Sequence, residues 1–111
     1  VGFEGRVGPL PAGVARFYRH HDGLLVARPA VEVFPLEVLV RNGAGLVPFC
    51  RFDGRHELSF DVRQLNQADE WTIVNAEAGF EVTLTMGSFL ANKLFAWLKR
   101  GRPVWRQESY E

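Results

Sequence analysis

Three histidines and one cysteine are the side chains of this sequence best suited to bind a metal or attack a substrate. His20 and His21 are adjacent, and neighbouring residues on a helix point in directions about 100° apart, so they cannot easily hold one ion. Cys50 lies in an apolar run that predicts a β-strand, where cysteine is ordinarily a small buried hydrophobe. We therefore expect neither a metal site nor a catalytic dyad among these residues and His56.

The turns of the sequence also lack a recognisable active site. Asp53-Gly54 begins like a calcium loop, but Arg55 follows, and no Asp or Asn occupies the next alternate positions. Residues 42–45 lack the spacing of a phosphate loop. The serine-hydrolase, zinc-hydrolase and zinc-deaminase motifs are missing as well. We predict a non-catalytic protein that needs no cofactor, which favours binding over turnover.

Charge is balanced in the whole chain but unevenly distributed. The 111 residues contain 13 basic and 13 acidic side chains, whereas a nucleic-acid-binding domain usually carries a positive excess. Residues 53–81 carry a net charge of −5, and residues 82–106 carry +5. Two interpretations remain open. Two solvated elements can neutralise each other, or the acidic segment can form a surface for a basic protein partner.

Five acidic residues are the candidates for partner binding: Asp53, Glu57, Asp61, Asp69 and Glu70. Glu57 and Asp61 are expected on the solvent face of one strand, with Asp53 in the turn before it. The polar loop after that strand is long enough to bring Asp69 and Glu70 to the same edge. The rival surface is the basic last helix, with Lys93, Lys99 and Arg100.

An N-terminal helix over residues 11–22 is predicted from apolar spacing. The side chains that share one helical face are Val14, Phe17, Tyr18 and His21. Gly23 supplies a left-handed stop. Because Leu10 is a poor N-cap, we expect neighbouring structure to satisfy the start of this helix.

Runs rich in β-forming residues predict strands near residues 31–34, 46–52, 57–62, 71–74 and 80–84. The strand over 57–62 alternates, with Leu58, Phe60 and Val62 toward the core and Glu57, Ser59 and Asp61 toward solvent. Asp53-Gly54 predicts a hairpin turn, and Pro48 an edge or a bulge. Residues 36–40 fit either one helical turn or a short strand.

A C-terminal helix is predicted from the apolar stripe Phe89, Leu90, Leu94, Trp97 and Leu98. Ser88 or Thr85 can cap it, and Gly101 and Pro103 end it. The order helix, strands, helix predicts one α+β domain over residues 1–111, with a loose entry segment over 1–9. We expect a mainly antiparallel sheet of about four to six strands, with both helices packed on one face.

Four motifs occur in sequence order: Leu10-Pro11 to Asp22-Gly23, Pro48-Phe49 to Phe60-Asp61, Trp71 to Gly79, and Ser88-Phe89 with Leu94. Over residues 10–98 they resemble the SUKH superfamily, named after the fungal Smi/Knr cell-wall regulators and rich in bacterial immunity proteins. Two departures stand out. Arg55-His56-Glu57 replaces the usual Gly-Asp of the central hairpin, and Ala91-Asn92-Lys93 replaces a commonly acidic stretch.

The resemblance implies a non-catalytic protein-binding domain, most simply an immunity protein that occludes a toxin domain in the producing cell's cytoplasm. The alternative is a regulatory or scaffold protein without a toxin partner, and a small enzyme with an unrecognised site comes third.

A single cysteine agrees with a reducing compartment. The longest uncharged stretch has 11 residues, against the roughly 17–25 of a membrane helix. We expect a monomer or a weak dimer.

Overall fold

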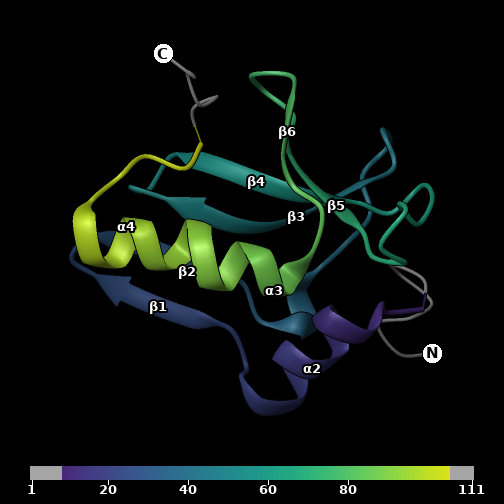
Figure 1. Ribbon diagram of the computed structural model, residues 1–111, viewed down its shortest axis with the longest axis horizontal. Helices are drawn as coiled ribbons and strands as arrows, with labels where there is room; N and C mark the ends of the chain where they lie inside the picture. The colour runs from purple at the N-terminus through teal and green to yellow at the C-terminus, as the bar shows by residue number, and fades with distance from the viewer. Residues whose placement is uncertain (1–8, 106–111) are drawn as a thin grey trace.

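The computed structural model describes residues 9–105. Six strands there form one sheet in the order β1-β2-β3-β4-β5-β6, and every neighbouring pair is antiparallel (Figure 1). The strands are β1 (Leu24–Ala27), β2 (Ala30–Val33), β3 (Leu46–Phe52), β4 (His56–Asp61), β5 (Thr72–Asn75) and β6 (Phe80–Thr83). The predicted α+β domain with a mainly antiparallel sheet is confirmed.

Two helical elements accompany the sheet. The first is α2 (Ala12–His20), and the second is a continuous C-terminal helix made of α3 (Met86–Ser88), a π-helical turn η2 (Phe89–Leu94) and α4 (Phe95–Arg100). Figure 1 shows the C-terminal helix lying across the sheet, with α2 beside its α3 end. The connection between β2 and β3 contains a 3₁₀ turn, η1 (Leu36–Val38), so that segment is a helical turn rather than a strand.

The core lies between the C-terminal helix and one face of the sheet. Phe49 of β3 stacks on Phe60 of β4 with ring centroids 3.9 Å apart. Phe89 packs edge-on against Phe49 and Phe52 from the helix side. The buried side chains of α2, Val14 and Phe17, belong to the same apolar cluster. The C-terminal helix therefore covers this face of the sheet, while α2 adds to the same core from beside the α3 end of that helix (Figure 1).

The alternation of β4 is confirmed on its core face, where Leu58, Phe60 and Val62 are buried. Its other face is less exposed than expected, because Ser59 is only 5% exposed. Ser59 is a small residue and pairs with Pro48 on one side and Val74 on the other. The larger neighbours shield it from solvent.

Several predicted turns and caps are present. The ladder between β3 and β4 shifts between Pro48 and Cys50, so Pro48 marks a bulge. Asp53 and Gly54 both have positive φ, as a tight hairpin turn requires. The Thr85 hydroxyl accepts a hydrogen bond from the Ser88 N–H at 2.9 Å, which makes Thr85 the cap of the C-terminal helix. Gly101 ends that helix at φ +63°.

The N-terminal region differs from expectation in two ways. The helix α2 ends at His20, so His21 is outside the helix and exposed. Strand β1 was not predicted, because its sequence Leu-Leu-Val-Ala shows no polar–apolar alternation. Gly23, between the two elements, has φ +85°, and a Cβ there would lie 2.5 Å from the Val33 carbonyl oxygen. Only glycine fits this approach.

The π-helical turn explains the spacing of the C-terminal stripe. Phe89, Leu94 and Trp97 are buried, whereas Leu90 and Leu98 are only partly so. Phe89 and Leu94 are five residues apart, and a π turn brings residues i and i+5 together. No helix within residues 9–105 is long and apolar enough to cross a membrane.

Candidate protein-binding surface

The C-terminal helix lies on the core face of the sheet (Figure 1), and the opposite face is bordered by the η1 turn through Val38. Four side chains of this outer face lie in register across four strands, namely Leu25, Glu32, Arg51 and Glu57. Leu25 is 78% exposed, although it is a large apolar residue. The outer face therefore combines apolar and charged groups in one row.

A shallow depression of about 440 Å³ lies on this face, lined by Glu32, Phe34, Val38, Val40, Pro48 and Arg51. Val38 and Val40 are each 56% exposed. The Arg51 guanidinium lies 5.3 Å from the centre of the Phe34 ring, within the range of a cation–π contact. Exposed apolar side chains bordered by charged ones are typical of a protein-binding surface.

Two of the candidate acids on this side are paired with arginines. Glu57 accepts a hydrogen bond from the Arg51 guanidinium at 2.7 Å, and this bond raises the pKa of Arg51. Asp61 accepts two hydrogen bonds from the Arg63 guanidinium, at 2.9 and 2.7 Å. These bonds lower the pKa of the Asp61 carboxyl. Each pair is internally neutral, so Glu57 and Asp61 do not make a negative patch.

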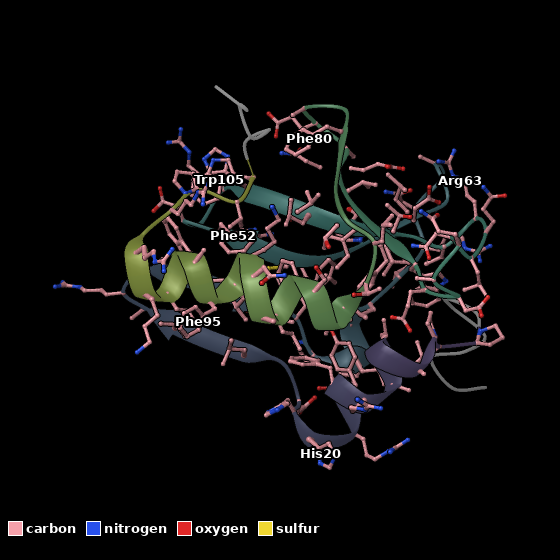
Figure 2. All side chains as sticks on the ribbon, in the orientation of Figure 1. His20, Phe52, Arg63, Phe80, Phe95 and Trp105 are labelled. Atoms are coloured by element: carbon pink, nitrogen blue, oxygen red, sulfur yellow. The ribbon has the colours of Figure 1, made fainter. Side chains whose placement is uncertain are left out.

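The other candidate acids do not gather at one edge. Asp53 lies in the turn before β4, and Asp69 in the loop after it, so the two are at opposite ends of the strand. Six residues of extended strand span about 17–20 Å. In Figure 2 the two ends of β4 can be followed from Arg63, which comes just after the strand, and from Trp105, whose ring stacks on His56 at its start. The expected single cluster of five acids is wrong.

The loop after β4 is held at its own end of the sheet by Asn66. The Asn66 amide donates to the Thr72 hydroxyl at 3.0 Å and to the Leu84 carbonyl at 2.8 Å. Its side-chain oxygen accepts from the backbone N–H groups of Ala68 and Glu70. This network folds the loop locally, which is why Asp69 does not reach the edge that carries Asp53.

Glu70 is not a surface residue. Its side chain is 8% exposed, and its Oε2 accepts a hydrogen bond from the Gly13 N–H at the start of α2. The expectation that Glu70 lies on an exposed acidic surface is therefore wrong. The carboxylate instead provides the compensation for the poor N-cap of α2 that the sequence led us to expect.

The reactive side chains are scattered. Cys50 is fully buried in β3, and this burial raises the pKa of its thiol, which disfavours the nucleophilic thiolate. His20 and His21 are exposed, and the His56 ring stacks on Trp105. Within residues 9–105, no group of three or more His, Cys, Asp or Glu side chains could hold a metal ion.

Sequence reasoning missed the apolar part of the outer face. Val38 and Val40 belong to the connection between β2 and β3, where the sequence gives no periodicity. The sequence signal available for these two valines is that they lie in a short, mostly apolar segment after Pro35.

Comparisons with known proteins do not assign this surface. No model of a protein family matches the sequence, and neither the curated proteins nor the solved structures contain a match. Its function has to be inferred from its own chemistry.

Proposed function

We propose that this chain is a non-catalytic protein-binding domain that neutralises a bacterial toxin domain by direct occlusion. The observation that carries the proposal is the outer face, where Leu25 of β1 and Val38 and Val40 of the β2–β3 connection are exposed beside charged side chains. The resemblance of residues 10–98 to the SUKH superfamily supports the same assignment. The protein would act in the cytoplasm of the producing cell, where it would meet a toxin before release.

Occlusion needs contact area and fit, with no chemical step. The apolar groups of the outer face would supply the buried centre of such an interface, and the ion pairs would lie toward its rim. A basic toxin surface can compete with Arg51 for the Glu57 carboxylate and with Arg63 for Asp61. Exchanges of this kind guide association and select the partner more than they add affinity.

The first test places a charge in the centre of the proposed interface. Toxin domains encoded in the genomic neighbourhood of this chain are produced, and each is titrated with the wild-type protein, Val38→Asp or Phe95→Asp in a calorimeter. A neighbourhood that encodes no toxin would count against the immunity function. Val38 and Phe95 are both about half exposed, but Phe95 lies on the C-terminal helix, on the opposite side of the sheet. We expect Val38→Asp to weaken binding at least about fivefold and Phe95→Asp to leave it unchanged. Equal effects of the two variants would reject the outer face.

The second test concerns the acidic candidates. Glu57→Gln combined with Asp61→Asn removes both negative charges without placing a lysine beside Arg51 or Arg63. We expect slower association and reduced protection of cells that carry the toxin. Unchanged protection would exclude Glu57 and Asp61 from the interface. If the chain binds no toxin but binds a defined regulatory protein through Val38, the regulatory alternative replaces the immunity function.

A further inference from the structure

A second hollow lies at the hairpin end of the sheet. It has a volume of about 530 Å³ and is lined by Arg55, His56, Asn75, Glu77, Phe80 and Trp105. These residues come from the β3–β4 hairpin, the β5–β6 hairpin and the segment after α4. Figure 2 shows Phe80 and Trp105 at the same end of the molecule, on neighbouring segments. The volume falls within the roughly 300–1,000 Å³ of ligand-binding pockets.

Buried contacts hold the walls of this hollow in place. The Asn75 side chain, 6% exposed, donates to the Trp105 carbonyl at 2.6 Å and accepts from the Ala78 N–H at 3.0 Å. The His56 ring stacks on Trp105 at 4.4 Å, and Trp105 packs edge-on against Trp97 in the core. The three segments are therefore fixed to one another before anything binds, which lowers the entropic cost of binding.

The lining has aromatic walls and two opposite charges. Arg55 and Glu77 belong to the facing hairpins, and both are exposed. Neither makes an ion pair within residues 9–105. Both also line a smaller depression of about 250 Å³ that contains Ser59, on the outer face. The hollow therefore adjoins the outer face through Arg55 and Glu77.

We propose that this hollow receives an aromatic side chain of the protein partner, an inference that rests on the proposed function. Phe80 and His56 offer partly exposed rings, and the nearly buried Trp105 supports His56 by stacking on it. An aromatic group satisfies such ring contacts best. Arg55 would donate a hydrogen bond to an acceptor that flanks the partner's aromatic side chain, and Glu77 would accept one from a flanking donor. A lining that carries one positive and one negative side chain does not suit a phosphate or another strongly charged ligand. Interface hot spots characteristically combine such pockets with buried aromatic anchors.

The test uses a small probe, so it does not depend on a known partner. N-acetyl-L-phenylalaninamide is titrated into isotope-labelled protein, and binding is followed by NMR. We expect saturable shifts at the Ala78 amide and the Trp105 indole N–H, and none with N-acetyl-L-alaninamide. Phe80→Ala should weaken probe binding about tenfold. Phe95→Ala, which removes an exposed ring elsewhere, should not change it.

Folding is checked separately, because Phe80 is partly buried. Arg55 is exposed, so Arg55→Gln gives a second variant that leaves the core intact. If the probe leaves Ala78 and Trp105 unaffected, or binds a folded Phe80→Ala protein unchanged, the aromatic site is wrong, whatever the partner assays show. If the probe binds as expected but no protein binds, the aromatic site stands, whereas its occupation by a protein partner and the proposed function are overturned. With a partner in hand, Phe80→Ala should weaken its affinity about 30-fold and Arg55→Gln less.

Discussion

The Glu70 carboxylate lies at the N-terminus of α2 and accepts a hydrogen bond from the Gly13 N–H at 2.9 Å. The two residues are 57 positions apart in the chain. Pro11, the residue that precedes the helix, makes no side-chain cap. A carboxylate near helix N–H groups satisfies a free donor and interacts favourably with the helix dipole. The loop after β4 is thereby tied to the N-terminal helix.

This contact predicts a coupling between positions 13 and 70. Alanine stabilises a helix relative to glycine by about 1 kcal/mol in the interior, and by less at Gly13, which is the second residue of α2. A Cβ on Gly13 would lie 2.7 Å from Glu70 Oε1, so Gly13→Ala displaces the carboxylate and loses the cap. We expect Gly13→Ala to stabilise the Glu70→Ala protein but not the wild type, with a coupling energy of about 1–2 kcal/mol. Urea unfolding of the wild type, the two single variants and the double variant measures this coupling energy. Additive effects of the two substitutions would contradict the prediction.

The Glu70 contact also shows where sequence reasoning ends. The strand pattern around Leu58 and Phe60 is local, so the alternation predicts which side is buried. Whether Glu70 faces water or a helix end depends on where the loop after β4 folds, and that is decided by Asn66 reaching Thr72 and Leu84. Such contacts between distant segments leave no periodic signal in the chain.

The core predicts a large loss of stability on removal of the Phe89 ring. Phe89 is fully buried and contacts both Phe49 and Phe52. Phe89→Ala should cost about 3–5 kcal/mol, through lost burial and the cavity left behind. Trp97→Ala should cost a similar amount, because its ring is buried and its Nε1 donates to the Ala30 carbonyl. Thermal and urea unfolding check this, and an unchanged melting temperature would show that the C-terminal helix is not docked.

Cys50 should be unreactive in the folded protein. Burial raises the pKa of its thiol, so almost no thiolate forms at neutral pH, and the strand excludes reagents. We expect modification by a thiol reagent to proceed only as fast as the protein opens, and to accelerate in denaturant. Rapid modification under native conditions would mean that β3 opens locally or that the thiol is accessible.

The Asp61–Arg63 pair gives a prediction for acid pH. The hydrogen bonds from Arg63 hold the pKa of Asp61 below its ordinary value of 3.8. Because the folded-state pKa is the lower one, the stabilisation is present above pH 3.8 and is lost as pH falls through the folded pKa. In an NMR titration, Asp61 should therefore titrate below 3.8 in the wild type and move upward in Arg63→Ala. An unchanged midpoint would show that the pair does not persist in solution.

The π-helical turn predicts opposite outcomes for two one-residue deletions. Removing exposed Ala91, inside η2, leaves Phe89 and Leu94 four residues apart, the spacing that a regular α-helix places on one face. The turn can then become α-helical while Trp97 keeps its position. Removing Ala96, inside α4, rotates Trp97 about 100° relative to Leu94 and takes it out of the core. We expect the Ala96 deletion to lose about 2 kcal/mol or more beyond the Ala91 deletion, as displacement of a buried aromatic side chain requires. Urea unfolding, monitored by tryptophan fluorescence, compares the two deletion variants. Each variant loses one alanine, so the residue type is matched. Equal losses would mean that the π turn does not set the register of the C-terminal helix.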